Sequence, residues 1–138
     1  MGYRRRGKHR VKIRLHADRE YVKPGECIVY TLLIENKHCE PLNMLVWDLL
    51  SNKVRFVHGS VCVNKYKFYK ADIESGVNLG VVYPDCEVSI RYEVKVVHGT
   101  YAEFVLSEAI VEFNDYIGNS GFKESNKVCV KIKNRACC

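Results

Sequence analysis

The chain has 138 residues, of which 47% are hydrophobic and 28% charged. This length suffices for one folded domain, and this composition excludes a disordered chain. No apolar run approaches the roughly 20 residues of a membrane-spanning helix, so no membrane partner is expected, whereas the net charge of +6 is compatible with an anionic partner.

The first nine residues form a basic arm that includes Arg4, Arg5 and Arg6. The arm lacks the apolar stretch and the cleavage site of a signal peptide, so ordinary secretion is not expected. We expect these three arginines to contact a neighbouring copy of the chain, where acidic residues between 103 and 112 offer partners. A nucleic acid is a less favoured partner for the arm.

Alternation with period two, rich in β-branched and aromatic residues, dominates the remainder of the chain. It predicts strands at 10–16, 27–35, 43–48, 60–67, 87–97, 102–114 and 126–133. Clusters of Pro, Gly, Asn and Asp separate most of these strands, as at 23–26 and 83–85. The pattern predicts an all-β domain of two packed sheets at 10–134, between the arm at 1–9 and a cysteine-containing tail at 135–138.

The order of several short segments resembles a known family. The segments are YVKPGE at 21–26, IVYTLLIEN at 28–36, VWD at 46–48, VHGSVCVN at 57–64, VNLG at 77–80, VSIRYEVKV at 88–96 and ESNKV at 124–128. Together they resemble the bacterial surface-protein repeat called domain of unknown function eleven. The resemblance implies an immunoglobulin-like antiparallel β-sandwich without catalytic residues, found in cell-wall proteins, adhesins, surface layers and ribbon-like spore appendages.

The chain contains seven cysteines, and none is an obvious core residue. Successive strand side chains face opposite sides, so the apolar rows of their strands leave Cys27, Cys62 and Cys129 pointing outward. The other cysteines lie in loops or in the tail, at Cys39, Cys86, Cys137 and Cys138. Because seven is an odd number, full oxidation within one chain is impossible, and we expect disulfides between subunits. Reduced, inert thiols are the alternative.

Two outward apolar residues, Val29 and Leu33, predict a buried contact between subunits. The outer row of the strand at 87–97 is polar instead, so only one part of the surface is expected to be adhesive. Trp47 is expected at a sheet edge or at the margin of the core.

No catalytic or metal-binding pattern is evident, so we expect no enzyme activity, no cofactor and no metal. The five histidines lack regular partner spacing, and His38 beside Cys39 is only a fragment of a zinc site. Four acidic residues are expected to be solvated in loops: Asp48, Asp72, Glu74 and Asp115.

The sequence therefore favours a self-assembling structural subunit of a spore appendage, coat or surface fibre, with itself as main partner and other spore or cell-surface proteins as further partners. The alternative is a monomeric, adhesin-like module that binds a ligand through loops around Cys39 and 66–72. A third hypothesis is nucleic-acid binding through the arm, supported by the lysines and aromatic residues at 65–70, although an edge hairpin explains that cluster equally well.

Overall fold

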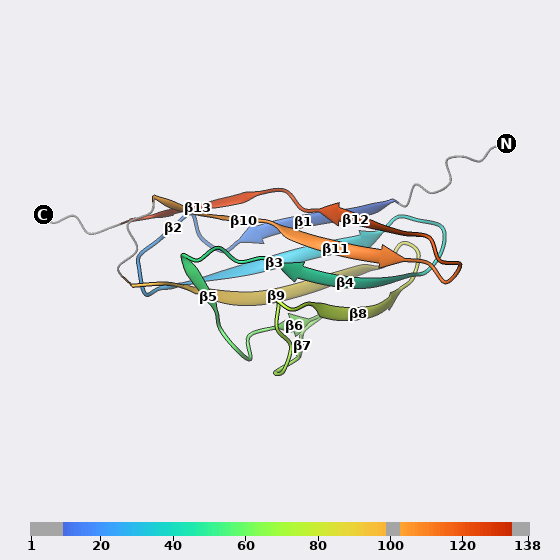
Figure 1. Ribbon diagram of the computed structural model, residues 1–138, viewed down its shortest axis with the longest axis horizontal. Helices are drawn as coiled ribbons and strands as arrows, with labels where there is room; N and C mark the ends of the chain where they lie inside the picture. Colours follow the sequence, from blue (N-terminus) through green and yellow to red (C-terminus); the bar gives the residue numbers. More distant parts are fainter. Residues whose placement is uncertain (1–9, 99–102, 134–138) are drawn as a thin grey trace, which may run out of the picture.

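The computed structural model describes residues 10–98 and 103–133, and each named element within them is a β-strand. Arg4, Arg5, Arg6, Cys137 and Cys138 lie outside the described residues. The predicted antiparallel β-sandwich is confirmed (Figure 1). Within the described residues, no helix is long and apolar enough to cross a membrane.

One layer of the sandwich is a six-stranded sheet in the order β1-β3-β9-β6-β7, with β5 also paired to β9. Its strands are β1 (Val11–Ala17), β3 (Cys27–Asn36), β5 (Val54–Phe56), β6 (Cys62–Val63), β7 (Tyr66–Lys67) and β9 (Glu87–Val96). Every pairing in this sheet is antiparallel.

The other layer consists of a four-stranded sheet, β12-β11-β4-β8, and a three-stranded sheet, β10-β13-β2. Their strands are β2 (Tyr21–Val22), β4 (Leu42–Asp48), β8 (Val77–Val82), β10 (Phe104–Ser107), β11 (Ala109–Asn114), β12 (Ser120–Glu124) and β13 (Val128–Ile132). The pairing of β13 with β2 is parallel.

The core lies between the layers and follows the predicted alternation. In β3, fully buried residues alternate with half-buried ones along all ten positions. Ile28, Tyr30, Leu32 and Ile34 are each 0% exposed, as the inward row predicts. This continuous apolar filling is the main stabilising contribution, because apolar surface removed from water supplies most of the folding free energy.

Two predicted strands are divided in the structure. The segment at 60–67 is the hairpin β6–β7, whose turn places Asn64 and Lys65 at φ of 50° and 76°. The segment at 102–114 breaks at Glu108, where the chain passes from the three-stranded to the four-stranded sheet. There the Ser125 hydroxyl accepts the Ala109 N–H at 2.9 Å, so a side chain stabilises the change of sheet.

Four further strand segments had no predicted counterpart: β2, β5, β8 and β12. In β8, Gly80 adopts a φ of 72° where the pairing with β4 shifts register between Met44 and Leu45. An irregular, glycine-containing strand of this kind gives little period-two signal. The edge strand β12 is almost entirely exposed, so it has no apolar row to reveal it.

The expectation of solvated carboxylates is wrong for Asp48 and Asp115, which are 1% and 5% exposed. Tyr92 Oη of β9 donates a hydrogen bond of 2.6 Å to Asp48 Oδ2 of β4. Asp48 therefore links the two layers of the sandwich. A second hydrogen bond also links the two layers: Ser107 Oγ of β10 donates to Tyr30 Oη of β3 at 2.7 Å.

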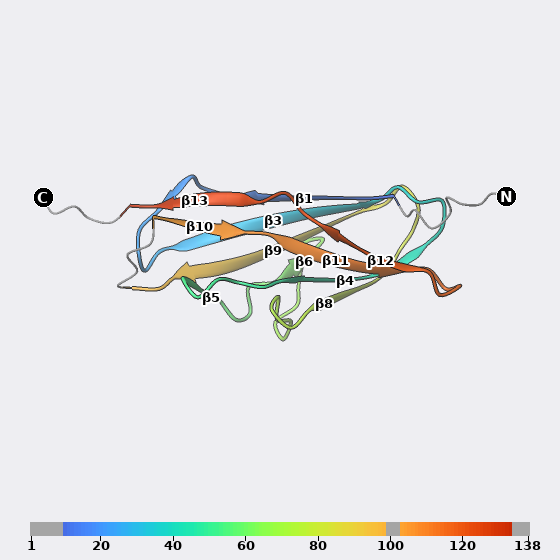
Figure 2. The same ribbon diagram turned by 45° about the horizontal axis from the view of Figure 1, so that its top comes forward.

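Strand β1 begins at one end of the long axis, and β13 ends at the opposite end (Figures 1 and 2). We call the first the Cys39 end; it contains the β3–β4, β8–β9 and β11–β12 connections. We call the second the Cys27 end; it contains the start of β3 and the end of β9.

Candidate functional site

The Cys39 end presents two exposed thiols, those of Cys39 and Cys86. The two loops that contain these cysteines are held in place by Asn36, the fully buried last residue of β3. The Asn36 side-chain amide donates to the carbonyls of Glu40 and Val82 at 2.9 Å each, and its Oδ1 accepts the His38 N–H at 2.8 Å.

Backbone hydrogen bonds attach the second loop to the same residue. Asn36 N donates to Cys86 O at 3.0 Å, and Asp85 N donates to Asn36 O at 2.8 Å. Asp85 has a φ of 62°, which short polar side chains tolerate better than most. One buried asparagine thus holds both cysteine-bearing loops together.

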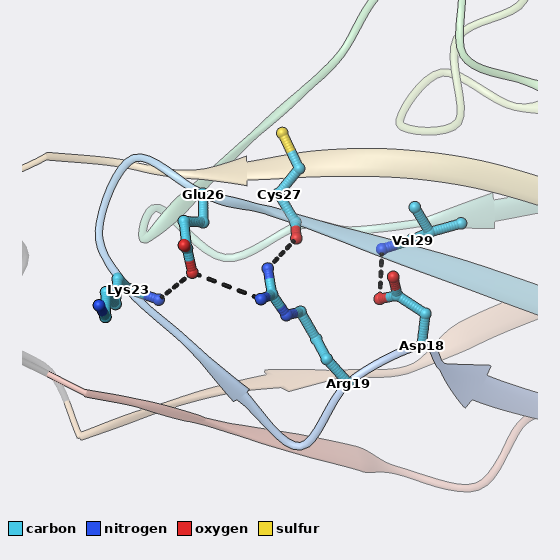
Figure 3. A network of polar contacts seen from close by, with 6 residues as sticks. All are labelled: Asp18, Arg19, Lys23, Glu26, Cys27 and Val29. Carbon is cyan, nitrogen blue, oxygen red and sulfur yellow. Dashed lines mark hydrogen bonds and ion pairs between the residues drawn. The ribbon is translucent and has the colours of Figure 1, made fainter.

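The Cys27 end is organised by Arg19, which donates from Nη1 to Cys27 O at 3.0 Å and pairs through Nη2 with Glu26 Oε1 at 3.5 Å (Figure 3). Glu26 Oε1 also accepts the Lys23 N–H at 3.0 Å. The Cys27 sulfur points away from this network. The backbone of Cys27 is therefore fixed by hydrogen bonding, whereas its thiol contacts Glu93 of β9.

Among the described thiols, Cys27 has a distinct chemical environment. Burial raises the pKa of the Cys27 thiol, and its hydrogen bond to Glu93 raises it further. Because the thiolate is the nucleophile in disulfide formation, a raised pKa reduces reactivity near neutral pH. Cys27 is therefore a poorer candidate for cross-linking than its outward position suggests.

Cys27 and Cys62 share the outer face of the six-stranded sheet, opposite Lys95 and Arg91 of β9. Four residues along β9 and two strand spacings separate them, which is roughly 16 Å and too far for one disulfide. All five described cysteines are free: Cys27, Cys39, Cys62, Cys86 and Cys129.

The two residues predicted as an apolar contact are half-buried and lie among polar neighbours. Val29 lies opposite Glu93, and Leu33 lies between Arg14 and Ser89. Each lines a separate surface hollow, of about 300 Å³ for Val29 and about 330 Å³ for Leu33. The structure does not join them into one apolar patch.

Sequence reasoning missed a more apolar surface on the outer face of the four-stranded sheet. Trp47 was expected at a sheet edge or at the margin of the core; it is half-buried on the interior strand β4, so the sheet edge is excluded. Its ring contacts that of Phe122 edge-on, with centroids 6.2 Å apart. Phe122 is 64% exposed and Val81 47%. The alternation of β4 could have predicted this surface. Met44, Val46 and Asp48 occupy the inward row, so Trp47 must lie on the outer face.

Three potential metal ligands lie close together at the Cys39 end, although one of them is distant from the other two in the sequence. His38, Glu40 and Asp115 each offer one ligand atom, and these atoms lie within 4.8 Å of one another. Two of the residues come from the β3–β4 loop and the third from the β11–β12 turn. Only the tertiary fold brings them together.

No family model matches the sequence, and no curated protein matches it. Solved structures share the fold. The major pilin subunit BcpA of Bacillus cereus aligns with a TM-score of 0.65 and 17% identity, over 91% of this chain and 40% of the pilin chain. This chain therefore spans about 40% of the length of that pilin.

Two other similar structures have different roles. The N-terminal domain of the Streptococcus gordonii adhesin Sgo0707 aligns with a TM-score of 0.61 and 10% identity, over 88% of this chain and 32% of that one. AvmM, which catalyses macrocyclization in alchivemycin A biosynthesis, aligns with a TM-score of 0.60 and 11% identity, over 93% and 91%. A pilin, an adhesin and a catalyst share this architecture, so the fold alone does not assign a function.

Proposed function

We propose that this chain is a structural, non-catalytic subunit that assembles with copies of itself into a surface fibre, cross-linked by disulfides between subunits. The observation that carries the proposal is the placement of exposed thiols at the end of an elongated sandwich. Cys39 and Cys86 are exposed at the end where β1 begins. Similarity in fold to a major pilin subunit supports the same role.

The arrangement favours head-to-tail contacts. Strand β13 ends at the Cys27 end, and Cys137 and Cys138 follow Lys133 within five residues of sequence. An extended segment of five residues spans at most about 17 Å. We propose that the tail cysteines of one subunit bond to Cys39 or Cys86 of the next. A contact of this heterologous type propagates into an open filament.

Each cross-link removes two protons and two electrons from a pair of thiols. The acceptor is an external oxidant, either molecular oxygen or a low-molecular-weight disulfide that is reduced by exchange. Assembly would therefore precede covalent locking, which takes place outside the reducing cytoplasm. The resemblance to repeats found in spore appendages supports the surface of a bacterial spore as the location, with other spore or cell-surface proteins as anchors.

Noncovalent contacts would bring the ends into register before oxidation. The outer face of the four-stranded sheet, with Trp47, Phe122 and Val81, is the more apolar described surface for a neighbouring subunit. Glu112 of β11 lies on the same face, opposite Phe122. It offers the basic arm, with Arg4, Arg5 and Arg6, an acidic partner there.

Electron microscopy and non-reducing gels of the purified, oxidised protein test the proposal. We expect filaments and a ladder of oligomers that collapses to monomer on reduction. The double variant Cys39→Ser/Cys86→Ser should lose the ladder. The control Cys62→Ser/Cys129→Ser, which removes two thiols away from the Cys39 end, should keep it. A monomer in both lanes without ordered particles would refute assembly.

A monomeric adhesin-like module remains the second candidate because aromatic side chains gather on the β6–β7 hairpin. Tyr66 and Tyr69 are 74% and 68% exposed, and the Lys67 ammonium lies over the Tyr69 ring, 5.7 Å from its centroid. Exposed aromatic rings on a projecting loop are suited to stacking on a ligand. Monomers that stay monomeric after oxidation would favour this role.

A further inference from the structure

The cluster of His38, Glu40 and Asp115 stands on loops whose backbone is fixed by hydrogen bonds. His38 N donates to Asn36 Oδ1, and Asn36 Nδ2 donates to the Glu40 carbonyl, so both residues of the β3–β4 loop are tied to one buried amide. Asp115 N donates to Asn119 O at 2.9 Å, which closes the β11–β12 turn. The ligand atoms therefore meet on two preformed loops.

The Asp115 carboxylate is oriented by the turn that contains it. Its Oδ1 accepts the backbone N–H groups of Ile117 at 3.0 Å and Asn119 at 2.9 Å, and its Oδ2 accepts the Asn119 side-chain amide at 3.2 Å. Hydrogen bonds of this kind fix the orientation of a ligating carboxylate. They also show that Asp115 is held in place independently of any ligand.

Glu40 gives a second, independent indication of a bound cation. Its Oε1 is buried and accepts no hydrogen bond, and it is the one such side-chain atom within the described part of the chain. A buried carboxylate oxygen without a partner is costly, and the nearby Asp115 carboxylate adds repulsion. A cation between the two carboxylates and the imidazole would offset both costs.

We propose that His38, Glu40 and Asp115 bind a single divalent transition-metal ion of the zinc class at the Cys39 end. One imidazole nitrogen and two carboxylate oxygens suit zinc, whereas calcium and magnesium prefer sets of oxygen ligands. Zinc bonds of about 2.1 Å hold tetrahedral ligand atoms about 3.4 Å apart. From separations of at most 4.8 Å, small side-chain rotations suffice to close the site.

The site leaves a fourth position open for water. It also lies beside Cys39, which is adjacent in sequence to His38. Binding would cross-link the β3–β4 loop to the β11–β12 turn and stiffen this end of the sandwich. The inference does not depend on the proposed assembly, because the three ligands belong to one subunit.

Calorimetric titration with zinc chloride tests the site directly. The seven thiols are first capped as methyl disulfides with methyl methanethiosulfonate, because free cysteines also bind zinc. We expect one zinc ion per chain, and at least tenfold weaker binding for His38→Ala and for Glu40→Gln. His16→Ala removes an exposed histidine from β1 and is the matched control; its binding should be unchanged.

Thermal unfolding of the same capped proteins gives a second measurement. In chelator, Glu40→Gln should be at least as stable as the native chain, because it removes the negative charge of a half-buried side chain whose Oε1 lacks a hydrogen-bond donor and lies near the Asp115 carboxylate. With zinc, the native chain should gain several degrees in Tm and Glu40→Gln should gain little. Absence of zinc binding by the capped native chain, or equal binding by both ligand variants, would overturn the proposal.

Discussion

At the scale of single residues, Cys27 differs from Cys39 and Cys86 both in exposure and in its neighbours, because it is half-buried whereas they are exposed. Burial, and then the hydrogen bond to Glu93, raise the pKa of the Cys27 thiol, so its thiolate fraction is reduced near neutral pH. We predict that Cys27 is alkylated several-fold more slowly than Cys39 and Cys86. Limited labelling with iodoacetamide at pH 8, followed by peptide mass spectrometry, measures all three rates in one sample.

The substitution Glu93→Gln separates the effect of Glu93 from that of burial. It removes the negative charge and keeps the side chain's size, so labelling of Cys27 should accelerate relative to Cys39. Glu87→Gln changes an exposed carboxylate at the other end of β9 and should leave the ratio unchanged. Equal rates for Cys27 and Cys39 in the native chain would contradict the prediction.

At the scale of elements, the Asp48–Tyr92 hydrogen bond connects β4 of one layer to β9 of the other. Burial raises the pKa of Asp48 from 3.8 to about 6, although the bond from Tyr92 opposes the shift. The folded state therefore holds the Asp48 proton more tightly than the unfolded chain. Protonation of Asp48 therefore stabilises the folded state. This stabilisation is fully present below about pH 4 and is lost as the pH rises through about 6.

We predict that Asp48→Asn removes this part of the pH dependence. A shift of about two pH units corresponds to about 3 kcal/mol at most, so the free energies of unfolding of the native chain and the variant should differ by a pH-dependent amount of that order. Urea denaturation between pH 4 and 7.5 measures the difference. Asp85→Asn, at an exposed turn, is the control and should parallel the native chain. Parallel curves for Asp48→Asn would exclude the assigned pKa.

The elements also show which features the sequence could predict. The inward row of β3 was predicted correctly. The alternation of β3 also places Asn36 inward, and that of β4 places Asp48 inward. Both residues are buried, but their polar side chains led to no prediction of burial. The change of sheet at Glu108 could not be predicted, because 104–114 reads as one continuous strand pattern. The meeting of His38 and Glu40 with Asp115 depends on the pairing of β4 with β11, which no local pattern encodes.

At the scale of the whole molecule, the position of the thiols matters more than their number. Cys39 and Cys86 lie on loops joined through Asn36, whereas Cys62 lies on the broad outer face of the six-stranded sheet. A fibre built through the ends needs only one thiol-bearing end and one tail per subunit. A sheet-like lattice would need the outer faces as well, with Cys62 and Cys129 engaged.

Mixing two variants distinguishes these arrangements. Cys137→Ser/Cys138→Ser retains the acceptor thiols of the Cys39 end, and Cys39→Ser/Cys86→Ser retains the tail thiols. Head-to-tail bonding predicts that neither variant forms a ladder alone, since each lacks one half of the contact. Oxidised together, they should form a disulfide-linked dimer that stops growing, because the joined pair has no further complementary ends. Long oligomers from either variant, or from the mixture, would show that the faces and not the ends carry the cross-links.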